Sequence, residues 1–336
     1  MPTPTRPSEA RSLGHPLLDR YPTFVEARTR PNTVLATASD LRIFFGVVAK
    51  APAEVTTADV LGFIEAQRAP LYDGKVVRLA DGEAGLMAST IKRRLSSVSG
   101  FYAYLVMTGA LAANPVPKGI ATRRRRRRRA ALVPLLRTPR RLPKILEPEE
   151  VNALFRALRH YRDRAMVEAM VLGGLRRCEV LGLRTEDLRP GERRLFIAEG
   201  KGGHQRLASV SARFFRSVSR YVESERPEGA TTKRLFVVLK GPRRGEPLSE
   251  DGLEEIVRAA KARAGLLHAT CHELRHTCLT RLREAGMALE ALQVQAGHRS
   301  IETTRLYLHL SNDWLADEYQ RAAALIDASM LQAVAQ

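Results

Sequence analysis

Residues 272–278 read HELRHTC, and this stretch admits two readings that lead to different folds. His272, Glu273 and His276 match the H-E-x-x-H pattern of zinc peptidases, in which two imidazoles one helical turn apart hold a metal ion beside a carboxylate base. The same stretch places Arg275 between the two histidines, and a guanidinium suits an anion. Nothing local decides between a cation and an anion, so the choice depends on the rest of the chain.

The composition of the 336-residue chain favours a polyanionic partner. The formal net charge is +19 and the isoelectric point is near 10.6. Because neutralising many phosphates releases condensed counterions and drives association, nucleic acid is the first expectation and an acidic membrane surface the second. With 44% hydrophobic residues, the chain is long enough for two domains that each bury a core.

The compartment is indicated by cysteine usage and by the N-terminus. Cys178, Cys271 and Cys278 are too few and too oddly numbered for a disulfide framework, which favours a reducing compartment. The first residues, MPTPTRPSEARSLGHP, lack the apolar core of a signal peptide, and no uninterrupted apolar run reaches membrane-spanning length. We therefore expect a cytoplasmic or nucleoid-associated protein with no membrane partner.

A basic block divides the chain. Residues 118–144, KGIATRRRRRRRAALVPLLRTPRRLPK, contain twelve Lys or Arg and no acid, so this block repels itself and does not fold alone. A solubilising or targeting tail is one interpretation, but the central position favours a linker that lies along DNA phosphates. The expected backbone contacts are Arg123, Arg124, Arg125, Arg126, Arg127, Arg128 and Arg129.

Helical periodicity dominates before this block. Apolar residues recur at intervals of four and three in two series, which is typical of amphipathic helices. Thr56 with Asp59 predicts a helix start, Gly109 predicts a helix stop, and residues 70–88 break the pattern and predict a loop. The series are Val34, Ala38, Leu41, Phe45 and Val48, then Ile91, Leu95, Val98, Tyr102 and Leu105.

After the block, helices enclose a few strands. Pro148 opens a predicted helix through EEVNALFRAL, and a second runs through RDRAMVEAMVLGG. RLFIAEG and QRLASVS predict a hairpin with Lys201 at its tip, and RLFVVLKG is a third strand candidate. From about residue 249 the pattern returns to helices, with Gly286 and Gly297 as stops.

Four short stretches of this second half contain polar residues that could together form an active site. Taken alone, each polar residue in them is better explained as a surface pair or as core. In order, however, GGLRRCEVLGL, GKGGHQR, HELRH and AGHRSIETTRLY resemble the tyrosine recombinase (phage integrase) family, whose active site is Arg, Lys, His-x-x-Arg, His or Trp, and Tyr. All six positions are filled, by Arg176, Lys201, His272, Arg275, His298 and Tyr307.

The resemblance covers residues 145–312 at motif level, and STIKRRLSSVSGFYAYL resembles the family's core-binding domain more loosely. It implies a mainly α fold with a small β-sheet, in which an N-terminal helical (SAM-like) core-binding domain precedes an α+β catalytic domain. The expected segments are a flexible N-terminus at 1–19, the core-binding domain at 20–115, an Arg-rich linker at 116–144, the catalytic domain at 145–312 and a C-terminal helix at 313–336. That helix either docks on a neighbouring subunit or packs on its own domain.

The resemblance also implies the reaction. Double-stranded DNA is cut and rejoined through a 3′-phosphotyrosyl link, without metal, ATP or another cofactor, by a homo-tetramer on two DNA sites. Accessory recombination proteins are further candidate partners. The basic linker and the irregular segment at 70–88 favour a mobile-element enzyme. Integration of a phage or mobile element, transposition and resolution of chromosome dimers all stay open as its biological task.

The residue types suit this chemistry. A phosphodiester under attack gains negative charge, and the planar forks of Arg176 and Arg275 bind phosphate oxygens in pairs, with Glu179 supporting Arg176. His298 adds a donor. Because an isolated phenol has a pKa near 10, Tyr307 as nucleophile needs the nearby cations and needs His272 as proton acceptor or its positioner.

Lys201 would protonate the departing 5′-oxygen. The opening question is therefore answered in favour of the anion, with His276 as a supporting histidine. The longer zinc-peptidase pattern also fails, because position 279 is Leu. Three alternatives stay open at this point: relaxation of supercoils in the manner of type IB topoisomerases, a catalytically silent DNA-binding regulator, and the zinc peptidase.

Overall fold

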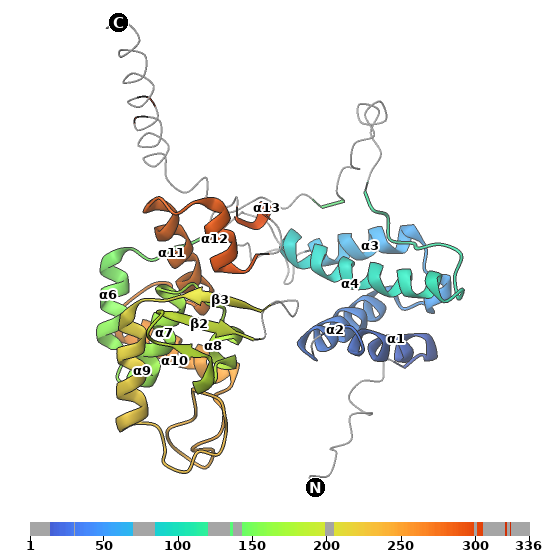
Figure 1. Cartoon of the computed structure of the whole chain (residues 1–336). Coiled ribbons are helices and arrows are strands. Elements are labelled where there is room, and N and C mark those ends of the chain that lie inside the picture. The colour runs from blue at the N-terminus through green and yellow to red at the C-terminus, as the bar shows by residue number, and fades with distance from the viewer. Residues whose placement is uncertain are drawn as a thin grey trace, which may run out of the picture. The chain divides into compact units, whose positions relative to one another are not determined.

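The computed structural model describes residues 14–29, 31–69, 85–119, 135–136, 143–198, 205–298, 301–304, 320 and 323. The chain divides into two compact units, residues 1–140 and residues 141–336. Within the described residues, unit 1 is helical and unit 2 combines helices with a three-stranded sheet (Figure 1). The expected fold class, mainly α with a small sheet, is confirmed.

Helices account for the regular structure of the described part of unit 1. They are α1 (Pro16–Glu26), α2 (Pro31–Val48), the 3₁₀ helix η2 (Pro52–Glu54), α3 (Thr57–Arg68) and α4 (Ala88–Met107). The predicted start at Thr56 is a capping box, because the Asp59 carboxylate accepts from the Thr56 amide at 2.8 Å. The predicted stop is also confirmed, since α4 ends two residues before Gly109, which has a φ of 75°.

The periodic apolar residues form the core of unit 1. All five of the second series are buried, and of the first series Val34, Ala38 and Leu41 are buried while Phe45 and Val48 are partly buried. In α2 the fully buried aromatic is Phe44, which stacks edge-on against Phe63 of α3. Most of the predicted loop at 70–88 lies outside the described residues.

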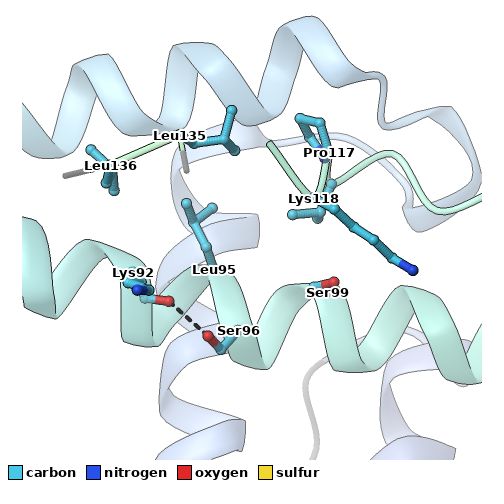
Figure 2. Close-up of a pocket in the computed structure, with 9 residues that line it drawn as sticks. Lys92, Leu95, Ser96, Ser99, Pro117, Lys118, Leu135 and Leu136 are labelled. Atoms are coloured by element: carbon cyan, nitrogen blue, oxygen red, sulfur yellow. Dashed lines mark hydrogen bonds between the residues drawn. The ribbon is translucent and has the colours of Figure 1, made fainter. Parts of the chain in front are cut away.

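Two segments that flank the arginine run lie on the same face of α4. Pro117 and Lys118 precede the run, and Leu135 and Leu136 follow it; all four line a cavity of about 350 Å³ beside Leu95 (Figure 2). Leu136 is buried in the core of unit 1. The described residues on either side of positions 120–134 therefore both lie beside α4.

Unit 2 begins with the two predicted helices. Its helices are α6 (Pro148–Ala157), α7 (Tyr161–Val171), α8 (Arg177–Gly182), η3 (Thr185–Asp187), α9 (Ala212–Ser224), α10 (Glu250–Arg263), α11 (Cys271–Glu284), α12 (Leu289–Ala296) and α13 (Ile301–Thr304). Helix α7 packs against both α9 and α11, and all of its residues except Tyr161 and Arg164 are buried. This helix is the centre of the unit 2 core.

The sheet has the order β1-β2-β3, with β1 (Leu188–Arg189), β2 (Arg194–Ile197) and β3 (Arg206–Ser209) all antiparallel. The register pairs Leu195 with Ala208 and Ile197 with Arg206. Leu195, Ile197 and Ala208 are buried, and side chains alternate between the two faces of a strand. Arg206 therefore stands in the buried row of its strand.

The third strand candidate, RLFVVLKG, is wrong. Within the described residues it makes only isolated bridges, Arg184 to Arg234 and Val237 to Pro247. Leu235, Phe236 and Val237 are consecutive and all buried, so this stretch lacks the alternation of a sheet with one exposed face. Its apolar run fills the core of unit 2, and the third strand of the sheet is β1.

The predicted helix stops of unit 2 are confirmed. Gly286 follows α11 with a φ of 90°, and Gly297 caps α12 with a φ of 61°. Among the described residues, no helix is both long and apolar enough to cross a membrane.

Candidate active site

Arg176 stands where two helices meet. Helix α7 ends at Val171, and Gly174 turns the chain with a φ of 66°. Arg176 then occupies the N-cap position of α8, and Glu179 lies in the first turn of that helix. The Glu179 carboxylate accepts from the Arg176 amide at 2.9 Å, so the helix start fixes both residues.

The side chain of Glu179 has no exposed surface, and its carboxylate lies within 4.0 Å of the guanidinium groups of three arginines. Arg176 Nη1 donates to Glu179 Oε1 at 2.9 Å. Arg206 on β3 donates from both Nη atoms, one to each carboxylate oxygen, at 2.9 Å each. Arg275 on α11 is further away, with its Nη1 4.0 Å from Oε2. One carboxylate therefore joins α8, β3 and α11.

The ionisation of Glu179 follows from these neighbours. Burial alone would raise the pKa of the carboxyl, but the hydrogen bonds and charge of Arg206, followed by those of Arg176, lower the pKa to about 2. Glu179 is therefore a carboxylate at neutral pH. The four side chains together carry an excess of two positive charges, which suits a phosphodiester.

Arg275 is held by backbone carbonyls. Its Nη1 donates to the Gly174 oxygen, and its Nη2 donates to the Ala296 oxygen at 2.7 Å. The same Nη2 lies 3.1 Å from Nε2 of His298, and His298 Nδ1 lies 3.0 Å from Thr304 Oγ1. These contacts place α11, the end of α12 and α13 around one guanidinium.

His272 and His276 face each other on α11. Their Nε2 atoms are 2.8 Å apart and their rings cross at 82°, so one imidazole donates a hydrogen bond to the other. Burial, followed by the charges of Arg275 and Arg176, lowers the pKa of His272. Burial, followed by the charge of His272, lowers the pKa of His276 to about 4. Both rings are therefore neutral at pH 7.

His298 is also neutral, because burial and then the charges of Arg275 and Arg176 lower its pKa to about 4. Near these residues lies a cavity of about 430 Å³. It is lined by Arg176, Arg177, Cys178, Glu250, Glu254, Thr270, Cys271, His272 and Arg275. Arg177 forms ion pairs with Glu250 and Glu254, so its charge is matched by acids of α10.

The structure brings together four of the six predicted catalytic positions: Arg176, His272, Arg275 and His298. The supporting residues Glu179 and His276 lie in the same cluster. Lys201, Tyr307 and the arginines at 123–129 lie outside the described residues.

Sequence reasoning missed Arg206, Gln295 and Thr304. Gln295 donates to the Gly173 and Ser209 oxygens at 2.8 Å each, and thereby joins α12 to β3 and to the turn before Arg176. A signal for Gln295 was present, because it is a polar residue among the buried positions of α12, next to Ala296.

The features that suggested a zinc peptidase are placed differently. The Nε2 atoms of His272 and His276 are directed at each other. Glu273, the base in that reading, has its Oε1 3.8 Å from Nδ1 of His268. Within the described part of the chain, no three His, Cys, Asp or Glu side chains form a group that could hold a metal ion.

Known proteins share both the sequence pattern and the fold. Residues 144–313 match the model of the phage integrase family. The tyrosine recombinase XerC of Pelobacter propionicus is 29% identical over 318 residues, covering 91% of this chain and 96% of that protein. XerC of Vibrio vulnificus is 32% identical over 264 residues, covering 75% of this chain and 77% of that protein.

A solved structure also resembles the chain. The integrase of the transposon Tn1549, in complex with transposon right-end DNA, aligns with a TM-score of 0.65 at 18% identity, covering 90% of this chain and 98% of that one. At this identity the likeness shows a common fold.

Proposed function

The chain belongs to the phage integrase family of tyrosine recombinases, and we propose that it is a site-specific DNA recombinase that cuts and rejoins double-stranded DNA through a 3′-phosphotyrosyl link. The observation that carries the proposal is the cluster of guanidinium groups around the buried Glu179 carboxylate. Arg176 and Arg275 approach one carboxylate, and both line the cavity that His272 also lines.

The cluster has the properties that in-line attack on phosphorus requires. The non-bridging oxygens of a phosphodiester gain negative charge in the transition state, and guanidinium groups held in place by protein contacts stabilise that charge without reorganising. Arg176 is held by Glu179 and by the Gly297 oxygen at 3.1 Å, and Arg275 by two backbone oxygens. We assign both to the scissile phosphate, with His298 as a further donor.

Tyr307 is the proposed nucleophile, on the family motif alone. Its attack on phosphorus forms a bond to the 3′-phosphate and releases the 5′-hydroxyl of the cut strand, so the energy of the phosphodiester is conserved and no ATP is needed. Lys201 would protonate the departing 5′-oxygen. In the reverse step, the 5′-hydroxyl of another strand attacks the phosphotyrosine and completes the exchange.

His272 is the proposed proton acceptor for Tyr307, or the group that positions it. A proton acceptor must be neutral, and the lowered pKa of His272 keeps it so at pH 7. His276 then has a supporting role, because its hydrogen bond to Nε2 of His272 fixes the orientation of that ring.

The seven arginines at 123–129 are proposed to contact the DNA backbone. Lys118 precedes the run and Leu135 follows it. Both line one cavity with Lys92 of α4 (Figure 2). The seven arginines would add their charge to that of the two lysines. Such contacts supply affinity and salt dependence without reading sequence.

We further propose a homo-tetramer acting on two DNA sites in the cytoplasm, at the nucleoid, with accessory recombination proteins as additional partners. We place it in a mobile element because of the arginine run and the irregular segment at 70–88. The sequence that flanks its gene tests this last point: element ends with an exchanged core at each junction are expected, and a conserved chromosomal neighbourhood would contradict it.

Covalent trapping on DNA tests the proposed reaction. Purified protein is incubated, with EDTA present and ATP absent, with nicked duplexes whose core is randomised, and protein-linked DNA is recovered after denaturation and sequenced. The wild-type chain should select a defined core sequence. The Tyr307→Phe variant, purified in parallel, should recover none.

Two labelled duplexes that carry the selected core then separate strand exchange from relaxation. Joint molecules with both labels are expected. Relaxation of a supercoiled plasmid without joint molecules would instead indicate a topoisomerase-like enzyme, and binding without any adduct would indicate a regulator.

A further inference from the structure

Arg206 is the residue that neutralises Glu179 most completely. Its two Nη atoms each donate to a separate carboxylate oxygen at 2.9 Å, whereas Arg176 makes one side-chain contact with that carboxylate and Arg275 comes no closer than 4.0 Å. This bidentate geometry is the strongest form of an Arg–carboxylate pair. The side chain of Arg206 is 10% exposed, so the pair is shielded from solvent.

The remaining contacts of Arg206 reach the end of α12. Its Nε donates to the Gln295 oxygen at 3.2 Å. The Gly297 backbone leaves room for the guanidinium, because a Cβ at that position would lie 2.8 Å from Arg206 Nη1. The Gly297 oxygen in turn accepts from Arg176 Nη2 at 3.1 Å. Arg206 and Arg176 are therefore coupled both through Glu179 and through Gly297.

A carboxylate in this place has two opposite effects on catalysis. It orients Arg176, which helps, but its negative charge also attracts Arg176 and Arg275 and opposes the binding of a phosphate. A third guanidinium that neutralises the carboxylate removes this competition with the phosphate. The carboxylate can still orient Arg176. Arg206 has this position, and it stands on the strand that follows the segment containing Lys201.

We infer that Arg206 is a positioning residue for strand cleavage: it pairs with Glu179 so that the charge of Arg176 and Arg275 is directed at the scissile phosphate. This inference rests on the proposed function. It differs from a purely structural role for Arg206, in which the residue would only satisfy a buried carboxylate and join β3 to α12.

The test measures the single-turnover rate of adduct formation on the nicked duplex selected by the wild-type chain. The variants are Arg206→Gln, Arg206→Lys and the double variant Arg206→Gln with Glu179→Gln. Arg194→Gln is the matched control, because Arg194 is on the neighbouring strand with a side chain that is 50% exposed. DNA affinity is measured separately with Tyr307→Phe added to each variant, and folding by thermal unfolding.

Arg206→Gln should slow adduct formation by about 10²-fold, the lower end of the loss seen when a preorganised donor is removed. DNA affinity should stay within about threefold, since a change in one buried group leaves the other phosphate contacts intact. Arg206→Lys should lie between Arg206→Gln and wild type, because it keeps the charge and loses the fork. Arg194→Gln should match wild type.

The double variant is decisive. If Arg206 acts by neutralising Glu179, removing the charge of Glu179 should recover at least about tenfold of the rate lost in Arg206→Gln. A double variant as slow as Arg206→Gln, or slower, would show a structural role and overturn the inference. Should Arg206→Gln not fold, Arg206→Lys with and without Glu179→Gln gives the same comparison.

Different results would overturn the role of Arg206 and the proposed recombinase function. An active wild type with an unchanged Arg206→Gln rate removes only the role of Arg206. A wild type that forms no adduct on any duplex of the randomised set removes the proposed function, and the role of Arg206 with it.

Discussion

The guanidinium of Arg275 and the imidazole of His298 are hydrogen-bonded, with 3.1 Å between Nη2 and Nε2. Because a guanidinium nitrogen only donates, Nε2 of His298 accepts, and the ring proton lies on Nδ1 and is donated to Thr304 Oγ1 at 3.0 Å. To donate from Nε2 to a phosphate, His298 must change tautomer. The Thr304 hydroxyl permits the change, since it can donate as well as accept.

Replacing Thr304 tests whether its hydroxyl supports the change of tautomer at His298. Thr304→Val keeps the shape of the buried side chain but removes the hydroxyl, so Nδ1 of His298 loses its partner in both tautomers, including the one that donates from Nε2. One hydrogen bond contributes about 0.5–1.5 kcal/mol, which corresponds to a rate of adduct formation roughly two- to tenfold lower. Thr303→Val, at the exposed neighbouring position, is the control. Equal rates for the two variants would show that Thr304 takes no part.

The pH dependence of cleavage reports on His272. As a proton acceptor His272 is active when neutral, and burial together with the charges of Arg275 and Arg176 lowers its pKa below the usual 6.5. Adduct formation measured in steps from pH 8 to pH 5 should therefore decline with a midpoint below pH 6.5. A decline with its midpoint above pH 6.5, or one that persists in His272→Gln, would exclude His272 as the group that titrates.

Gly297 and Gly286 form a matched pair for a packing test. Both have a left-handed backbone, with φ of 61° and 90°, so alanine should cost about 1–2 kcal/mol of unfolding free energy at either position. A Cβ at Gly297 meets Arg206, however, and a Cβ at Gly286 meets nothing within 4 Å. Thermal unfolding should show both losses, while adduct formation should slow in Gly297→Ala only. Equal slowing in both would mean that strain alone is responsible.

The C-terminal residues test assembly. The stretch after residue 311, NDWLADEYQRAAALIDASMLQAVAQ, contains four acids and one base, so it is poorly suited to lie on DNA. We expect deletion of residues after 318 to abolish cooperative assembly on paired sites while single-site binding is kept, as measured by gel shift with one-site and two-site duplexes. Assembly that is unchanged by the deletion would show that this segment packs on its own unit or has no part in docking.

Much of the site could be predicted from sequence because its motifs, in order, resemble those of a known family and because residues of the same motif lie close together. Arg176 with Glu179, and His272 with Arg275, lie within one helical turn of each other, so spacing alone places them together. The order of the motifs then added His298, which meets Arg275 in the structure. Helix starts and stops were similarly predictable, because caps such as Thr56 depend on neighbours three residues away.

What sequence reasoning missed depends on contacts between distant elements. Arg206 meets Glu179 across 27 positions and Gln295 across 89, and no local spacing indicates either contact. Two signals were available, since Arg206 ends the stretch GKGGHQR and stands in the buried row of β3, two residues from Ala208, but neither signal identifies its partner. The stretch RLFVVLKG was mistaken for a strand because an apolar run predicts burial but does not specify which backbone it pairs with.

Identification of the residue that is covalently linked to the DNA tests whether Tyr307 is the nucleophile. Trypsin acting on the trapped complex should cut after Arg305 and Arg321, which leaves Tyr307 and Tyr319 on one peptide, residues 306–321. After nuclease treatment, fragmentation by mass spectrometry should place a 3′-linked nucleotide on Tyr307. A nucleotide on Tyr319 or on any other residue, or an adduct that still forms in Tyr307→Phe, would exclude Tyr307 as the nucleophile.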